Sequence, residues 1–292
     1  MGSSIAFIGF GEVGQLFGRQ LAARPDVTVA AWDVLFEAPG TGEGLRRLAA
    51  DFGVRAAAST LDACRGAEIV ISAVTADSAL AAAAGAAPGL DPSQVYVDLN
   101  SVSPATKARV AAEAGRSGAA FVEFAVMAPV ADPGLRVPIL SGGERAAEVS
   151  ARLNGLGMNI EAVSREIGVA SASKLCRSIV IKGMEALMVD FTLAAEEAGV
   201  KGHVLASLEA SYPGMDWEAL ARTMIARVRR HGVRRAAEMR EASRMMSEFG
   251  LDGSLAEAIA GRHEAVAREA QVSGSSSPGP SPSPSASTAG TA

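Results

Sequence analysis

The apolar positions in the first half of the chain form short continuous runs, separated by longer amphipathic or alanine-rich stretches. Short apolar runs rich in β-branched residues are typical of buried strands, and the stretches between them are typical of helices. Helices are expected from Glu12 to Arg24, after the third strand and from about Pro104. The expected strands lie at 5–10, 27–33, 67–74, 95–100, 119–126 and 138–143. Strands that alternate with helices predict right-handed crossovers and therefore an α/β fold, a Rossmann-type doubly wound parallel sheet.

From about Gly168 the pattern becomes helical throughout. Residues 168–200 contain no proline, so a long helix is expected there, and Gly199 supplies a plausible stop because glycine accepts the left-handed conformation. Further helices are expected at 215–232, 234–250 and 254–270. The predicted domains are a Rossmann domain at 1–165, an all-α domain at 166–271 built on the long helix, and a disordered Ser/Pro-rich tail at 272–292.

Composition narrows the class of protein. The 292 residues are enough for two domains, and 49% hydrophobic with 20% charged residues is typical of a globular chain. The net charge of −5 disfavours a general nucleic-acid binder. Cys64 and Cys176 are far apart and outside any Cys/His cluster, so no metal site or disulfide framework is indicated. No apolar run approaches the ~20 residues that span a bilayer, and the N-terminus does not resemble a signal peptide, so a cytoplasmic location is expected.

A glycine-rich turn follows the first expected strand, in the sequence "IAFIGFGEVG". Gly9 permits the tight turn, Gly11 lets the backbone approach a pyrophosphate, and Gly14 lets the following helix pack closely on the strand. The free N–H groups at the helix N-terminus would face the phosphates. This arrangement predicts a dinucleotide site; a methyltransferase that binds S-adenosylmethionine, or an ordinary turn, are the alternatives.

Asp33 closes the second strand, where its carboxylate can accept from the adenosine ribose hydroxyls and would repel a 2′-phosphate. NAD is therefore favoured slightly over NADP. The predicted cofactor-binding residues are Gly9, Phe10, Gly11, Glu12, Val13, Gly14, Asp33, Val74 and Thr75.

Four motifs in order carry a family resemblance: "FIGFGEVG", "VYVDLNSVSP", "EFAVMAPV" and the helix that begins "VASASKLCRS". The chain resembles the β-hydroxyacid dehydrogenase superfamily, which includes 3-hydroxyisobutyrate and 6-phosphogluconate dehydrogenases, and within it a subgroup whose C-terminal domain has no known function. The resemblance implies an NAD(P)-dependent oxidoreductase, a homodimer formed through the helical domain, and a site in which Lys174 is the catalytic general acid/base. The same group would take the proton of an alcohol during oxidation and donate it during reduction.

The resemblance also implies residues that contact the substrate: Asn100, Ser101, Met127, Arg177, Ser178 and His231. Three departures from the family stand out. The loop after the fifth strand is "MAPVADPG" where the family has a Ser-Gly-Gly sequence. Ser178 stands where the family commonly has Asn, and Arg177 stands where phosphogluconate dehydrogenases have His. The expected substrate is a small polar metabolite similar to a hydroxy acid. An imine reductase of the same architecture and a nucleotide-binding protein without catalysis are the alternatives.

Overall fold

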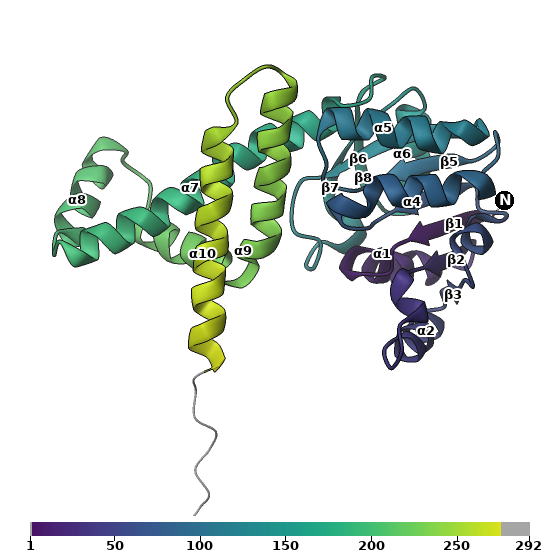
Figure 1. Ribbon diagram of the computed structural model, residues 1–292, viewed down its shortest axis with the longest axis horizontal. Helices are drawn as coiled ribbons and strands as arrows, with labels where there is room; N and C mark the ends of the chain where they lie inside the picture. Colours follow the sequence, from purple (N-terminus) through teal and green to yellow (C-terminus); the bar gives the residue numbers. More distant parts are fainter. Residues whose placement is uncertain (1, 276–292) are drawn as a thin grey trace, which may run out of the picture. The chain divides into compact units, whose positions relative to one another are not determined.

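The computed structural model describes residues 2–275, which form two compact units (Figure 1). The first unit comprises the chain up to Gly183 together with Ala237–Glu257. The second comprises Met184–Ala236 and the described residues from Ala258 onward. The boundary expected at 165/166 stays a prediction. Most of the tail predicted at 272–292 lies outside the described residues, and the last helix continues to Ser275.

An eight-stranded sheet in the order β3-β2-β1-β4-β5-β6-β7-β8 confirms the predicted fold class. All neighbouring strands are parallel except β6 and β7, which are antiparallel. Six of the strands match expected ones. The bounds are β1 Ser3–Ile8, β2 Val27–Trp32, β3 Arg55–Ala56, β4 Ile69–Ser72, β5 Val95–Asp98, β6 Ala120–Val126, β7 Pro138–Gly142 and β8 Asn159–Ser164.

Two strands, β3 and β8, were not expected from the sequence. The first is only two residues long, and the second buries only Ile160, so neither forms a continuous apolar run. They pair at the two edges of the sheet, where a strand needs fewer buried side chains.

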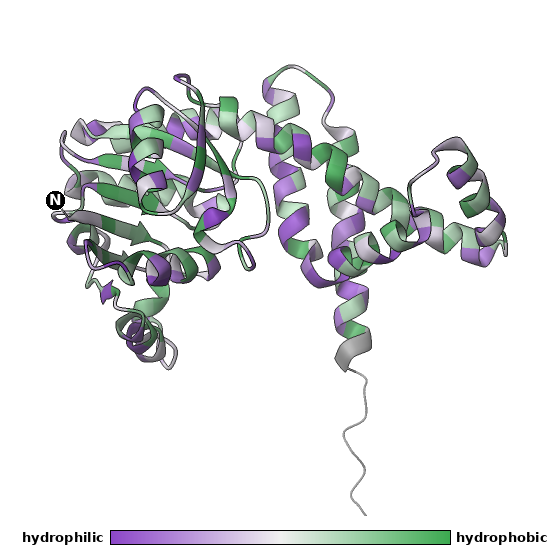
Figure 2. Ribbon diagram, turned by 180° about the vertical axis from the view of Figure 1, so that it is seen from behind, coloured by the Kyte–Doolittle hydropathy of each residue, from purple (hydrophilic) through white to green (hydrophobic). Residues whose placement is uncertain are grey.

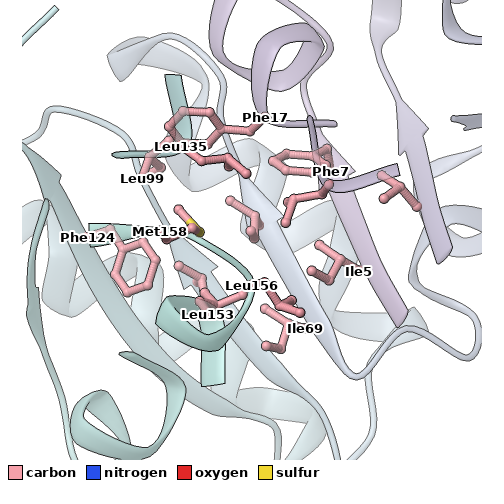
Figure 3. Packing of buried hydrophobic residues seen from close by; sticks show 14 of the residues in the cluster. Ile5, Phe7, Phe17, Ile69, Leu99, Phe124, Leu135, Leu153, Leu156 and Met158 are labelled. Carbon is pink, nitrogen blue, oxygen red and sulfur yellow. The ribbon is translucent and has the colours of Figure 1, made fainter. Parts of the chain in front are cut away.

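Helices cover both faces of the sheet, as parallel strands require. Ile5 and Phe7 of β1 belong to one apolar cluster and Ala6 and Ile8 to another, because successive side chains of a strand point to opposite faces. Figure 3 shows the first cluster, in which Phe17 packs with strand residues. In Figure 2 these strands are largely green, the colour of hydrophobic residues. The helices here are α1 Glu12–Ala22, α2 Gly42–Asp51, α3 Thr60–Cys64, α4 Ala79–Ala86, α5 Pro104–Ala114 and α6 Ala146–Gly155, and short 3-10 turns include η1 Val34–Glu37.

Four further helices follow: α7 Val169–Glu197, α8 Lys201–Ser211, α9 Trp217–Glu248 and α10 Ser254–Ser275. The long helix expected at 168–200 is confirmed as α7. The expected separation of 215–232 from 234–250 is wrong, because α9 continues through Gly232. A Cβ at Gly232 would lie 2.4 Å from the carbonyl oxygen of His263 in α10, so this glycine allows two helices to approach rather than ending one. Among the described residues, no helix has the length and hydropathy needed to cross a bilayer.

Candidate active site

The three glycines of the loop between β1 and α1 have different surroundings. Gly9 adopts a φ of +102°, and a Cβ there would lie 2.4 Å from the carbonyl oxygen of Ala73. At Gly14 a Cβ would lie 2.2 Å from the carbonyl oxygen of Gly9, whereas at Gly11 it would meet nothing within 4 Å. Folding therefore requires Gly9 and Gly14, while Gly11 leaves open space beside the backbone. Gly11 is the N-cap of α1. Because a glycine has no side chain to cover the first N–H groups of the helix, these groups are open to a pyrophosphate.

Asp33 connects this loop to the turn after β2. Its Oδ2 accepts the backbone N–H of Phe10 at 2.6 Å, and its Oδ1 accepts that of Leu35 at 2.8 Å, where Asp33 is the N-cap of η1. The carboxylate thus holds the shape of the glycine loop. A carboxylate has about four acceptor positions, so these two bonds leave room for a ribose hydroxyl. The ribose contact stays a prediction.

Asn100 is a buried residue of the loop that follows β5. Its Oδ1 accepts the backbone N–H of Val74 at 2.7 Å, while its Nδ2 donates to Ser72 Oγ at 3.0 Å and to Asp98 Oδ1. Both amide hydrogens are therefore used within the protein. Asn100 joins the ends of β4 and β5 and holds Val74, one of the predicted cofactor residues, in place. Its contact with substrate stays a prediction.

A buried ion pair supports the same loop and was not expected from the sequence. Lys107 Nζ lies 2.7 Å from Asp98 Oδ2 and donates to the Asp98 carbonyl at 2.8 Å, and both side chains are fully buried. Leaving one such charge without the other would be costly, so the pair fixes the end of β5 from which Asn100 and Ser101 follow.

Lys174 projects from the second turn of α7 and donates a hydrogen bond to Ser101 Oγ. Its side chain is half-buried. The predicted catalytic lysine and the Asn-Ser motif, which are far apart in the sequence, therefore meet at the carboxyl end of the parallel strands. Ligands of open α/β sheets bind at that edge.

The start of α7 is held by Glu123, which is fully buried in the middle of β6. Its Oε1 accepts the backbone N–H groups of Gly168 at 2.7 Å and Ala170 at 2.9 Å. A carboxylate at a helix N-terminus satisfies N–H groups and opposes the positive end of the helix dipole. Glu123 thus sets the position from which Lys174 extends.

Ser178 lies one turn after Lys174 and is buried. Its Oγ donates to Glu238 Oε1 at 2.6 Å and accepts from Lys182 Nζ at 3.0 Å. Lys182 also lies 3.0 Å from Glu238 Oε2. Burial by itself raises the pKa of the Glu238 carboxyl, but the charges of Lys174 and Lys182 and bonds from Ser178 and Lys182 outweigh it and lower the pKa to about 2. Glu238 is therefore ionised at neutral pH.

The remaining residues predicted to contact the substrate or the cofactor differ in their exposure and in their own hydrogen bonds. Arg177 is exposed on α7, and Met127 is half-buried, with its backbone N–H donating to the Pro138 carbonyl at 2.9 Å. Thr75 is exposed and donates to Ser78 Oγ at 3.0 Å. His231 is an exposed residue of α9 in the second unit. The other three cofactor predictions flank the glycines: Phe10 is buried, Val13 half-buried and Glu12 exposed.

Sequence reasoning missed Lys182 and Glu238. Lys174, Ser178 and Lys182 follow the i, i+4, i+8 spacing of one helix face, which is a usable signal for Lys182. Glu238 lies in an arginine-rich segment that resembles a solvated helix surface, and no local pattern distinguishes it from the neighbouring acids.

Comparisons with known proteins agree with this architecture. Residues 4–152 match the NAD binding domain of 6-phosphogluconate dehydrogenase, and residues 195–266 match a domain of unknown function, DUF1932. A conserved hypothetical protein from Sinorhizobium meliloti is 41% identical, with a TM-score of 0.79, over 92% of this chain and 89% of that one. The conserved protein MTH1747, described as structurally similar to 3-hydroxyacid dehydrogenases, is 32% identical over 93% of this chain and 99% of its own, with a TM-score of 0.73.

A more distant structure shares the fold. The 3-hydroxyisobutyrate dehydrogenase of Mycobacterium tuberculosis is 18% identical over 92% of this chain and 95% of its own, with a TM-score of 0.75. The matched domain and the site geometry support an NAD(P)-dependent oxidoreductase. The chain belongs to the β-hydroxyacid dehydrogenase superfamily, in the group that carries this C-terminal domain of unknown function.

Proposed function

We propose that the protein is an NAD(P)-dependent dehydrogenase or reductase that acts on the hydroxyl/carbonyl group of a small, polar metabolite similar to a hydroxy acid. The hydrogen bond from Lys174 to Ser101 carries this proposal. It holds an amine at the edge of the sheet where the nicotinamide ring of a dinucleotide bound to the glycine loop is expected.

Lys174 is the general acid/base of the proposed reaction. The nicotinamide supplies or accepts the hydride when it is bound. The neutral amine of Lys174 takes the hydroxyl proton during oxidation, and its ammonium form returns a proton to the carbonyl oxygen during reduction. Ser101 Oγ accepts from Lys174 Nζ and so aims the amine, while Asn100 holds the adjoining loop.

We propose NAD as the preferred dinucleotide. Asp33 places a negative charge where a 2′-phosphate would have to fit, and the residues directly after it, Val34 and Leu35, provide no cation to bind that phosphate. Fluorescence titration with NADH and NADPH measures this preference, and tighter binding of NADPH would contradict it.

The first experiment is a panel of 2- and 3-hydroxy acids and 1,2-amino alcohols, followed at the absorbance band of the reduced nicotinamide with each cofactor. Lys174→Ala should lower turnover by about 10²–10⁴-fold while NADH binding persists. Lys201→Ala, which removes an ordinary lysine paired with Glu196 on the surface, is the matched control. Full turnover by Lys174→Ala would exclude the lysine from the chemistry, and binding of neither dinucleotide would contradict the whole proposal.

The alternative is an imine reductase of the same architecture. Those enzymes generally replace this lysine with another proton donor, so the presence of Lys174 favours the hydroxyl/carbonyl reaction. Cyclic imines added to the same panel distinguish the two, because only an imine reductase would oxidise NAD(P)H with them and leave the carbonyl compounds unchanged.

We also propose that two copies pair through their helical residues, as the family resemblance implies. Helix α8 has no buried residue, and apolar side chains such as Leu187, Leu193 and Tyr212 are more than half exposed. Burial of these side chains against a second copy would remove them from water. Light scattering after size exclusion tests this, and a monomer at micromolar concentration would contradict it.

A further inference from the structure

The C-terminal part of α9 supplies three carboxylates to the loop and helices around Lys174. Glu241 accepts the backbone N–H of Ser103 at 2.9 Å. Glu248 accepts from Ser103 Oγ at 2.6 Å and from the backbone N–H of Ala105 at 3.2 Å. Glu238 lies three residues before Glu241, within the same compact unit, and interacts with the lysine face of α7. These glutamates lie within the domain of unknown function, 195–266, so part of that domain takes part in the site.

Glu238 differs from the other two carboxylates because its partners are charged. Its two oxygens contact Ser178 and Lys182, and Lys174 acts on it electrostatically. Both Lys182 and Ser178 are buried, and Glu238 is mostly buried, so water screens these charges poorly. One carboxylate thus serves two ammonium groups that lie on the same helix face.

This arrangement has a direct consequence for the lysine that transfers the proton. A nearby anion favours the ammonium form of a lysine, and a nearby cation disfavours it. Glu238 and Lys182 therefore act on Lys174 in opposite directions. Ser178 donates its only hydroxyl proton to Glu238, which fixes the carboxylate and leaves Ser178 no proton to donate to a substrate.

We infer that Glu238 is a positioning residue that keeps Lys174 in its ammonium form in the resting protein, with Lys182 as the opposing charge. This inference rests on the proposed function, and it explains why the chain has Ser178 where the family commonly has Asn: the serine orients a carboxylate from α9. The resting enzyme thereby carries the proton that the reduction consumes.

Other charged groups near the site are already engaged. Asp98 and Lys107 pair with each other beneath the loop. Glu241 is bound to the Ser103 backbone and contacts Arg244. Arg177 on α7 is exposed to solvent. Removal of Glu238 or Lys182 should therefore change the protonation of Lys174 more than removal of any of these other charged groups.

The experiment compares Glu238→Gln and Lys182→Gln with the parent protein. Each substitution removes one charge and keeps a polar side chain of similar reach. Glu257→Gln, a surface acid of the same unit that pairs with Arg240, is the matched control. The rate of reduction falls as the pH rises and Lys174 loses its proton. The midpoint of this fall should lie about one pH unit or more lower in Glu238→Gln than in the parent protein, and higher than in the parent protein in Lys182→Gln. The control should leave the profile unchanged.

A second readout does not depend on turnover. The rate at which an acetylating reagent modifies the Lys174 amine, followed by mass spectrometry across a pH series in the cofactor-free protein, reports the fraction of neutral amine. The midpoint should move down in Glu238→Gln and up in Lys182→Gln. Unchanged midpoints in both variants would overturn the inference, even where kcat falls. Absence of turnover with shifted midpoints would instead contradict the proposed function and leave the charge relation intact.

Discussion

The Glu123 carboxylate accepts the backbone N–H of Gly168 at 2.7 Å, from a fully buried position in the middle of β6. The same oxygen accepts the N–H of Ala170. One side chain of the sheet therefore fixes the first turn of the helix that carries Lys174. A Cβ at Gly142 would lie 2.7 Å from this oxygen, so β7 needs a glycine opposite the carboxylate.

Glu123→Gln should lower the free energy of unfolding by about 1–3 kcal/mol, because an amide oxygen accepts more weakly than a carboxylate and has no net charge to oppose the helix dipole. Urea denaturation followed by circular dichroism measures the loss. Glu161→Gln, at an exposed position of β8, is the control and should change the stability by less than about 0.5 kcal/mol. Equal stabilities of the two variants would contradict the capping role.

Two substitutions separate the structural glycines of the nucleotide loop from the one that leaves space for a ligand. Gly14→Ala should destabilise the protein by about 1–3 kcal/mol, since its Cβ would lie 2.2 Å from the Gly9 carbonyl oxygen. Gly11→Ala should fold with nearly unchanged stability, because its Cβ meets nothing within 4 Å, but should weaken NADH binding by about tenfold or more.

Thermal unfolding and fluorescence titration with NADH on both variants provide the measurements. The loss of stability should appear in Gly14→Ala, and the loss of NADH affinity at unchanged stability should appear in Gly11→Ala. If Gly11→Ala bound NADH as tightly as the parent protein, the dinucleotide would not approach the backbone at this loop.

A matched pair of glycines tests the helix crossing within the second unit. Gly232→Ala should destabilise the protein by about 1–3 kcal/mol, because its Cβ would lie 2.4 Å from the His263 carbonyl oxygen. Gly261→Ala, in α10 with nothing within 4 Å of its Cβ, should stabilise by about 0.5–1 kcal/mol through helix propensity. Chemical denaturation checks both, and a neutral Gly232→Ala would show that α9 and α10 need no close approach there.

The charge cluster around Glu238 predicts a specific dependence of stability on pH. The pKa of this carboxyl is about 2 in the folded protein, below its ordinary value of 4.5. A lowered pKa contributes stability that is complete above pH 4.5 and is lost as the pH falls toward 2. The amount by which the free energy of unfolding of the parent protein exceeds that of Glu238→Gln should therefore decrease by roughly 3 kcal/mol as the pH falls across this range.

Urea denaturation of both proteins at several pH values between 2 and 7 measures this difference. The difference between the parent protein and Glu257→Gln should stay nearly constant over the same series, because that acid is on the surface. If the stability difference between the parent protein and Glu238→Gln did not depend on pH, the Glu238 anion would be no better stabilised by the folded protein than that of an exposed glutamate.

Most of the sheet and the nucleotide loop were predictable because their signals are local. Apolar runs predicted six of the strands, and Gly9, Gly11 and Gly14 have the spacing that a strand–turn–helix unit requires. The edge strands and α8 were missed because they bury too few side chains to produce a pattern. The supposed break at Gly232 was an error of the same kind, since a glycine that permits helix contact resembles a glycine that ends a helix.

The chain's local order of residues was sufficient to identify the fold and the dinucleotide loop, and the family resemblance indicated Lys174 as the candidate proton carrier. The partners of that lysine depended on folding. Ser178 and Glu238 are 60 residues apart, and Ser103 and Glu241 are 138 apart, so their contacts leave no periodic trace in the sequence. A carboxylate becomes part of a site when packing removes it from water beside two ammonium groups, and packing is a property of the assembled helices and sheet rather than of any one segment.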